Sequence, residues 1–207
     1  MPKEGRKLKV VLLGPDGAGK SSVIRGLMEK LGQSGRIVKM RHLKPRIYIT
    51  GRGEAIVVVT DPHGASPRSA PVSIAKIFFW LLEEWFAHLF HDKKDELLIC
   101  DRYYHDLLID SRRYRYGGPR WAAQLVGKLI PQPQLWLLLD APPEVLRARK
   151  QEVTPEETAR QRQAYLDFVR KQKRHGVIDA SQELNQVIAD AGDAIRGAVI
   201  EYEGKGE

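Results

Sequence analysis

A glycine-rich octapeptide directly after a short apolar run limits the architectures open to this chain. The run Leu8–Leu13 has the length and composition of a buried strand, and Gly14–Ser21 fits the pattern G-x-x-x-x-G-K-[ST]. A helical segment starts near Lys20 and stops at Gly32. Because strand, glycine loop and helix follow one another in the order that phosphate binding requires, we expect a nucleoside triphosphate site at this loop.

The residue types of the loop suit that ligand. Glycines let the backbone curve around an anion with its N–H groups pointing inward, and the following helix adds partial positive charge at its N-terminus. Lys20 is expected to reach the β- and γ-phosphates, and the Ser21 hydroxyl to bind Mg²⁺. The residues expected to bind the nucleotide are Gly14, Asp16, Gly17, Ala18, Gly19, Lys20, Ser21 and Ser22. GTPases, ATPases, kinases and helicases share such a loop, so the loop alone does not define the reaction.

Apolar runs of strand length alternate with amphipathic segments along the rest of the chain. Their hydrophobicity is nearly continuous, as in strands that helices cover on both faces of a parallel sheet. The candidate strands are Leu8–Leu13, Ile37–His42, Leu97–Cys100, Leu135–Leu139 and Val177–Ile178. Helices are expected over 20–31, 72–91 and 183–202. The pattern predicts an α/β fold with three layers, α/β/α, around a five-stranded parallel sheet.

Three further segments have their own signals. Residues 43–71 are rich in glycine and proline, and we expect a long ordered excursion there with a short hairpin through Ile56–Thr60. Thr154 begins a helix that extends to about residue 173, because Pro and two Glu follow this N-cap residue. The apolar stretch Ile77–Phe90 is interrupted by acidic residues, so we expect a buried helix and no membrane span.

Composition limits the class of protein without choosing its activity. A chain of 207 residues can bury one substantial core, and we expect residues 1–207 to form a single domain. The single cysteine, Cys100, lies in an apolar run and cannot form an internal disulfide, and the N-terminus is too polar for a signal peptide. Both features favour the cytoplasm. The net charge of +8 suits either a nucleic-acid surface or an enzyme with polyphosphate substrates.

A second constellation, Asp101-Arg102-Tyr103, comes immediately after the apolar run that ends at Cys100. Ligands of open α/β sheets bind beyond the carboxyl ends of the strands, which places this tripeptide near the glycine loop. An acid there can hold Mg²⁺ or orient a nucleophile, and an arginine can grip a second phosphate. The alternative is that Asp101 caps the next helix and Arg102 is a solvated charge.

The order of these landmarks resembles the thymidylate kinase family. Besides the glycine loop and Asp101-Arg102-Tyr103, the chain has Leu139–Glu144 followed by two arginines, and Val177–Ala180 before a terminal helix. The resemblance implies an ATP-dependent kinase of the P-loop NTPase fold with a short helical lid at about 147–163. It implies that Asp16 lies near the acceptor sugar, Asp101 near the metal and Arg102 on the acceptor phosphate. The lid cations would come from Arg147, Arg149, Lys150, Arg160 and Arg162.

The acceptor segments differ from the family pattern. Where the family has an arginine-containing loop after the second strand, this chain has His42–Arg46, and Arg46 is the candidate for that part. Residues 111–119 interleave three arginines with two tyrosines, a composition suited to an anionic and aromatic acceptor, although a basic helix end or a nucleic-acid contact has the same composition. The residues expected to bind the acceptor are Asp16, Arg46, Arg102, Tyr103 and Arg112.

Three functions follow as hypotheses. The first is phosphoryl transfer from ATP to a nucleoside monophosphate, with dTMP as the first acceptor to test. The second is a P-loop kinase for another small acceptor, such as a nucleoside or a sugar phosphate. The third is a regulatory NTP-binding protein or a nucleic-acid-associated ATPase, which only the basic charge favours. Family members are commonly dimers, so a homodimer through the apolar helix 72–91 is also expected from the resemblance.

Overall fold

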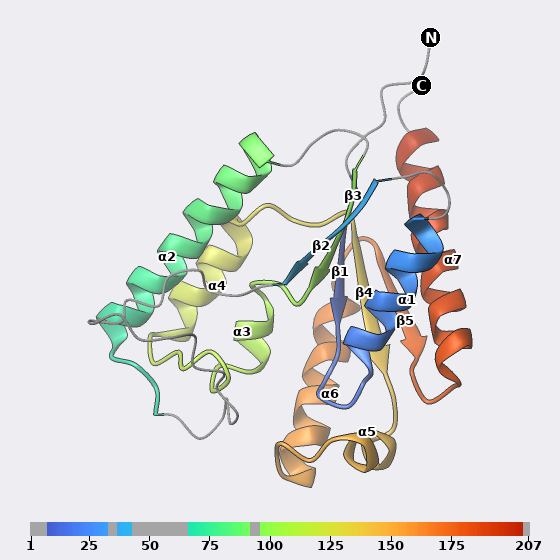
Figure 1. Cartoon of the computed structure of the whole chain (residues 1–207). Helices are drawn as coiled ribbons and strands as arrows, with labels where there is room; N and C mark the ends of the chain where they lie inside the picture. The colour runs from blue at the N-terminus through green and yellow to red at the C-terminus, as the bar shows by residue number, and fades with distance from the viewer. Residues whose placement is uncertain (1–7, 33–36, 43–65, 92–95, 205–207) are drawn as a thin grey trace, which may run out of the picture.

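The computed structural model describes all residues except 1–7, 33–36, 43–65, 92–95 and 205–207. Its centre is a five-stranded parallel sheet in the order β2-β3-β1-β4-β5 (Figure 1). The strands are β1 (Leu8–Leu13), β2 (Ile37–His42), β3 (Glu96–Asp101), β4 (Leu135–Asp140) and β5 (His175–Asp179). The predicted α/β architecture is therefore confirmed. Arg46 and the hairpin expected at Ile56–Thr60 lie outside the described residues.

The helices cover both faces of this sheet. They are α1 (Lys20–Gly32), α2 (Ala70–Phe86), the π-helical turn η1 (Ala87–His91), α3 (Asp106–Ile109), α4 (Arg120–Leu129), α5 (Pro143–Arg149), α6 (Pro155–Val169) and α7 (Leu184–Gly204). In Figure 1, α1 and α7 lie on one side of the sheet, and α2, α3, α4 and α6 lie on the other. This arrangement confirms the three-layer prediction, because each face of the sheet is covered by helices.

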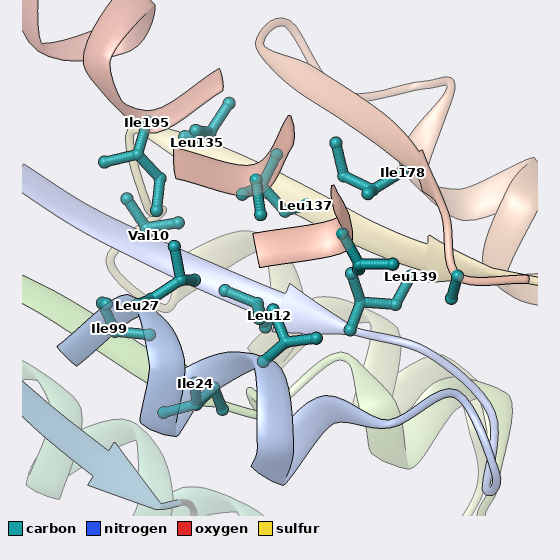
Figure 2. Packing of buried hydrophobic residues seen from close by; sticks show 14 of the residues in the cluster. Val10, Leu12, Ile24, Leu27, Ile99, Leu135, Leu137, Leu139, Ile178 and Ile195 are labelled. Atoms are coloured by element: carbon teal, nitrogen blue, oxygen red, sulfur yellow. The ribbon is translucent and has the colours of Figure 1, made fainter. Parts of the chain in front are cut away.

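Strand β1 is the central strand, and its alternate side chains enter two separate cores. Val10 and Leu12 point to the face covered by α1 and α7, where they pack with residues such as Ile24, Leu137 and Ile195 (Figure 2). Apart from Lys9, the side chains of β1 on both faces are apolar, as the continuous hydrophobicity of the strands predicted. The carboxyl end of β1 therefore leads out of the middle of the sheet straight into the glycine loop.

The second core lies under α2, α3, α4 and α6 and is rich in aromatic side chains. Its buried aromatic members are Trp80, Tyr103, Tyr104, Tyr114, Tyr116, Trp136 and Tyr165. Trp80 meets the rings of Tyr104 and Tyr114 edge to face at 6.0 and 5.6 Å. Such ring pairs fix the orientation of the segments that hold them. The tyrosines after β3 are thus part of the core.

Helix α2 is not the buried helix that its apolar sequence predicted. Only one side of it is buried, through Ser73, Ile77, Trp80 and Glu84. Large apolar side chains on the rest of α2 and on η1 are exposed, namely Val72, Ile74, Phe78, Phe79, Leu82, Trp85, Phe86, Leu89 and Phe90. In the part of the chain that the structure describes, no helix is long and apolar enough to cross a membrane.

The start of α6 follows its sequence signal. Thr154 is the N-cap, Pro155 occupies the first turn, and the Thr154 hydroxyl accepts a hydrogen bond from the Glu157 backbone N–H at 3.3 Å. This bond satisfies one of the helix donors that lack an intrahelical partner. The short segment that links α5 to α6 therefore ends at a defined N-cap, Thr154.

Candidate active site

The glycine loop joins β1 to α1 at the carboxyl edge of the sheet. Gly17 and Gly19 have φ angles of 86° and 79°, a region that side-chain-bearing residues rarely adopt. A β-carbon on Gly19 would meet no atom within 4 Å, whereas one on Gly17 would overlap the main-chain carbonyl of Leu146. The loop is thus open at the N-terminus of α1 and tightly packed against α5. An open backbone cradle at a helix N-terminus is the arrangement that binds phosphate groups.

Lys20 is buried at the base of this cradle. Its Nζ donates hydrogen bonds to the carbonyls of Gly14 at 2.6 Å and Pro15 at 3.0 Å. Burial and the nearby Arg102 charge lower the pKa of Lys20 to about 7, against the opposing effect of Asp16 and other carboxylates. A phosphate beside this amine would favour its charged form. Lys20 therefore has the position and the chemistry of a phosphate ligand.

Two oxygen-bearing side chains could hold a divalent cation next to the cradle. Ser21 is exposed in the first turn of α1, while Asp101 is buried at the end of β3 beside Leu12 of β1. The charge of Asp101 acts on Lys20, which places this carboxylate close to the loop. A hydroxyl and a carboxylate are the ligand types that Mg²⁺ prefers, so the donor set fits that ion.

Arg102 connects the end of β3 to the glycine loop. Its φ of 69° lies in the left-handed region, a strain of about 1–3 kcal/mol for a residue with a side chain. Its guanidinium donates to Asp16 Oδ1 at 2.9 Å and to Asp106 Oδ2 at 3.2 Å. Burial opposes the charge, but Asp106 and other neighbours hold the pKa of Arg102 well above its usual value. A permanently charged guanidinium is thus fixed beside the loop.

Arg113, which the sequence did not single out, reaches the same carboxylate. Its Nη1 lies 2.5 Å from Asp16 Oδ2, and its Nη2 lies 3.6 Å from Glu152 Oε2 in the segment between α5 and α6. Burial alone would raise the pKa of Asp16, but the charges of Arg113 and Arg102 lower this pKa below its usual range. Asp16 is therefore an ionised bridge between two arginines.

The expected lid spans the end of α5, the linking segment and the first half of α6. Arg147 donates to the Val153 carbonyl at 2.9 Å, and Arg149 donates to the Ala180 carbonyl at 2.7 Å. Both guanidinium groups therefore bind main-chain oxygens of nearby segments. Gly17 packs against Leu146, so the helix that bears both arginines adjoins the glycine loop.

The other cations considered for the lid are engaged with acids. Arg160 pairs with Glu157 and also donates to the Ile109 carbonyl at 2.9 Å. Arg162 forms a two-pronged pair with Asp140, with both N···O distances at 2.8 Å. Lys150 Nζ lies 2.6 Å from Glu152. The Arg160 bond to Ile109 and the Arg162 pair with Asp140 hold α6 against the rest of the domain, whereas the Lys150 pair lies within the linking segment.

Two residues expected at the acceptor site lie elsewhere. Tyr103 is 1% exposed, and its hydroxyl lies within hydrogen-bonding distance of two acceptors, Glu84 of α2 and the Pro131 carbonyl, on the side of the aromatic core. Arg112 is exposed, and its charge acts on Glu157 of α6. The structure thus brings together Asp16, Lys20, Asp101 and Arg102, but it places Tyr103 in the core and Arg112 at the surface.

The parallel sheet with the glycine loop at the end of its central strand defines a P-loop nucleotide-binding protein. The family model described as thymidylate kinase matches residues 13–191 of the chain. The chain belongs to the thymidylate kinase family, and it is accordingly an ATP-dependent kinase with nucleoside monophosphate kinase activity. A search among curated proteins gave no match.

Sequence reasoning missed Arg113, Glu152 and Asp106 as neighbours of Arg102 and Asp16. The arginine cluster at 111–119 did indicate a charged acceptor segment, but nothing in the sequence shows which arginine of a turn faces the loop. Asp106 lies on α3, a helix of four residues that has too few turns for a periodic signal. Glu152 is a single acid in a polar stretch, so its position depends on the fold alone.

Proposed function

We propose that the chain transfers the γ-phosphoryl group of ATP to the phosphate of a nucleoside monophosphate, with dTMP as the preferred acceptor, giving a nucleoside diphosphate and ADP. The strongest support comes from Arg102, the residue after Asp101, whose guanidinium forms hydrogen bonds with both Asp16 and Asp106. The guanidinium lies against Asp16 of the phosphate loop and so can face an acceptor phosphate directly opposite the donor. Family membership supports the same class of reaction.

On the donor side, Gly14–Ser22 hold the phosphates of ATP through backbone N–H groups, and Lys20 contacts the β- and γ-phosphates. Ser21 and Asp101 hold Mg²⁺, directly or through water. The ion, when held there, would supply positive charge that offsets the charge of the donor phosphates. These residues keep the terminal phosphate in place, while burial keeps competing water away from Lys20.

On the acceptor side, Arg102 binds the acceptor phosphate through charge-assisted hydrogen bonds, and Asp16 faces the acceptor sugar. Arg113 adds a second guanidinium at the same carboxylate. Phosphoryl transfer depends on cations around the moving group, since little covalent chemistry falls to the protein. Residues 147–163 form the lid, and Arg147 and Arg149 supply their charges to the reacting phosphates once the lid has moved. The chain of residues 1–207 forms one domain.

A panel of acceptors tests the proposal. Purified protein is incubated with ATP and Mg²⁺ together with single nucleoside monophosphates, nucleosides, sugar phosphates, DNA or RNA, and ADP release is measured. We expect dTMP to give the largest stimulation, with dTDP as product. Stimulation by nucleic acid alone, or equal turnover with Lys20→Ala, would contradict the proposed function.

A kinase for a different small acceptor is the second candidate, and the segment around Arg113 favours it. Two arginines already engage Asp16, and the tyrosines that follow them are packed in the core, with Tyr114 7% and Tyr116 8% exposed. Few aromatic faces are thus left at this segment to stack on a base. In the same panel, greatest stimulation by a nucleoside or a sugar phosphate would identify this second function.

A homodimer and a cytoplasmic location complete the proposal. The second copy would cover the apolar surface of α2, η1 and α4, where Phe78, Leu82, Trp121 and Leu125 are each more than half exposed. Trp85 Nε1 donates to the Leu129 carbonyl at 3.0 Å, so α2 and α4 form one continuous surface (Figure 1). Apolar patches this extended on an isolated protein mark interaction sites. The reducing cytoplasm suits the buried thiol of Cys100.

A further inference from the structure

Asp106 is a wholly buried carboxylate that accepts hydrogen bonds from three different segments. Tyr165 donates to its Oδ1 at 2.7 Å, while Arg102 and Tyr114 donate to its Oδ2 at 3.2 and 3.3 Å. Asp106 is 0% exposed, and the side chain of Arg102 is 11% exposed. A buried carboxylate is costly unless its oxygens are satisfied, and here both are.

The two tyrosines remain donors at any ordinary pH. Burial and the charge of Asp106 raise the pKa of Tyr114 and that of Tyr165 well above the usual value. Each phenol therefore keeps its proton and has one role toward the carboxylate, that of donor. The Asp106 carboxylate is consequently held in one orientation. This orientation fixes the direction of its hydrogen bond with Arg102.

Arg102 needs such an anchor more than an ordinary surface arginine does. Its backbone is strained, and its guanidinium must lie at a fixed angle between Asp16 and any acceptor phosphate. Small errors in the placement of a charged group at a transfer site lower the rate strongly. Asp106 binds Nη1 of Arg102 and thereby leaves Nη2 directed at the phosphate loop.

Tyr165 brings α6 into this arrangement. It lies on the helix that starts at Thr154, directly after the linking segment that holds Glu152. We propose that Asp106 and Tyr165 are positioning residues that fix the guanidinium of Arg102 for the acceptor phosphate and tie its orientation to α6. This inference rests on the proposed role of Arg102, and it adds two residues that do not touch the substrate themselves.

The test compares two variants that each remove one buried tyrosine hydroxyl. Tyr165→Phe removes the donor to Asp106 Oδ1. Tyr104→Phe is the matched control, because the hydroxyl of Tyr104 donates to the Ala123 carbonyl at 3.0 Å, whereas the hydroxyl of Tyr165 donates to Asp106. We expect Tyr165→Phe to raise the KM of the acceptor about tenfold, the size of one hydrogen bond to a charged group, with the KM of ATP unchanged. Tyr104→Phe should leave both constants at the parent values.

A double variant separates positioning from general stability. In an Arg102→Lys background, Tyr165→Phe should no longer change the acceptor KM, because the group that it positions is gone. An equal, additive effect in both backgrounds would overturn the proposal. So would a fall in Tm for Tyr165→Phe with an unchanged acceptor KM, since that result describes a purely structural tyrosine.

A readout without substrate keeps the inference separate from the proposed function. The ¹⁵N guanidinium resonances of Arg102 are assigned in the labelled protein by comparison with Arg102→Lys. They should shift in Tyr165→Phe and stay in place in Tyr104→Phe. If no acceptor gives turnover, the proposed function fails, and these resonances alone decide the inference. Unchanged resonances in Tyr165→Phe would then refute it.

Discussion

Gly17 of the phosphate loop lies in main-chain contact with Leu146 of α5. A β-carbon at residue 17 would stand 3.0 Å from the Leu146 carbonyl carbon and closer still to its oxygen. The loop and the start of the proposed lid are therefore packed backbone to backbone. Since the lid is expected to move during the reaction, this contact limits how α5 can travel relative to the loop.

Gly17→Ala should destabilise the protein and weaken nucleotide binding. The new β-carbon meets both a positive φ of 86° and the Leu146 backbone, which cannot give way as a flexible side chain can. Gly19→Ala is the matched control, because its φ of 79° is similar but its β-carbon meets nothing within 4 Å. We expect a loss of about 1 kcal/mol for Gly19→Ala and clearly more for Gly17→Ala, measured by urea unfolding. Equal losses would show that the contact with Leu146 has no effect.

Lys20→Ala and Arg102→Ala should damage different sides of the reaction. Removal of the Lys20 amine takes away the charge at the donor phosphates, so turnover should fall by about a thousandfold or more. Arg102→Ala should chiefly raise the KM of the acceptor, with the binding of ATP retained. Steady-state kinetics with each substrate varied in turn distinguishes the two patterns. A normal acceptor KM in Arg102→Ala would exclude this residue from the acceptor site.

Replacing Glu84 alone should lower the free energy of unfolding more than replacing Lys9 and Glu84 together, because the two residues form a buried ion pair. Lys9 Nζ lies 3.3 Å from Glu84, and both side chains are at most 3% exposed. Glu84→Leu removes a carboxylate that pairs with both Lys9 and Arg41, and we expect a loss of about 3–5 kcal/mol in the free energy of unfolding. The double variant Lys9→Met/Glu84→Leu should regain part of that loss, because it removes the Lys9 charge while Arg41 and Tyr103 still lack the Glu84 carboxylate. A double variant as unstable as Glu84→Leu alone would mean that packing, not charge, is responsible.

The stability of the protein should depend on pH through His105. Burial among aromatic rings lowers the pKa of His105 to about 4, despite a hydrogen bond to the Gly127 carbonyl and the nearby charge of Asp106. In the unfolded chain the pKa is about 6.5, so between these values the unfolded state binds a proton that the folded state does not. The free energy of unfolding should therefore rise with pH from 4 to 6.5, by at most about 1.4 kcal/mol per unit.

His105→Gln isolates this contribution. Glutamine stays neutral and can still donate a hydrogen bond, so the variant should lose the part of the slope that comes from residue 105. Urea unfolding of both proteins in steps between pH 4.5 and 7 gives the difference. Parallel curves for parent and variant would disprove the assignment.

The proposed dimer can be tested on the exposed face of α2. Phe78→Glu places a charge on a side chain that is 55% exposed in the single chain, and we expect it to convert dimers into monomers. Ile200→Glu is the control, because Ile200 is 71% exposed but lies on α7, on the opposite side of the sheet. Light scattering coupled to size exclusion measures the mass. A parent protein that is already monomeric would exclude this surface as a dimer interface.

The strands and the phosphate loop could be predicted from the sequence, because their signals are local. The bounds of β1 and β2 agree with the apolar runs, and the loop motif needs only its immediate neighbours. Helices α3, α4 and α5 were missed, and of these α3 and α5 are too short to show a helical period. The sequence wrongly predicted that α2 is buried, because an apolar helix face at an interface has the same composition as one in a core.

The acceptor side of the site depends on contacts between distant segments. The choice of Arg113 over Arg112 at Asp16 follows from the turn after α3, where Arg115 also has a positive φ of 50°. The bond between Asp106 and Tyr165 joins α3 to α6. No pattern within a short window of sequence encodes either relationship, whereas Asp101 and Arg102 were found because a strand end marks the ligand edge of the sheet.

The central place of β1 also sets the order in which a nascent chain can fold. This strand is synthesised first, yet it pairs with β3 and β4, which begin at residues 96 and 135. Until β4 has left the ribosome, one edge of an almost wholly apolar strand stays without its native neighbour. Long-range pairing of this kind slows folding and exposes aggregation-prone surface. The topology that places the phosphate loop in the middle of the sheet thus leaves the newborn chain with an incompletely paired apolar strand until residues 135–140 have been made.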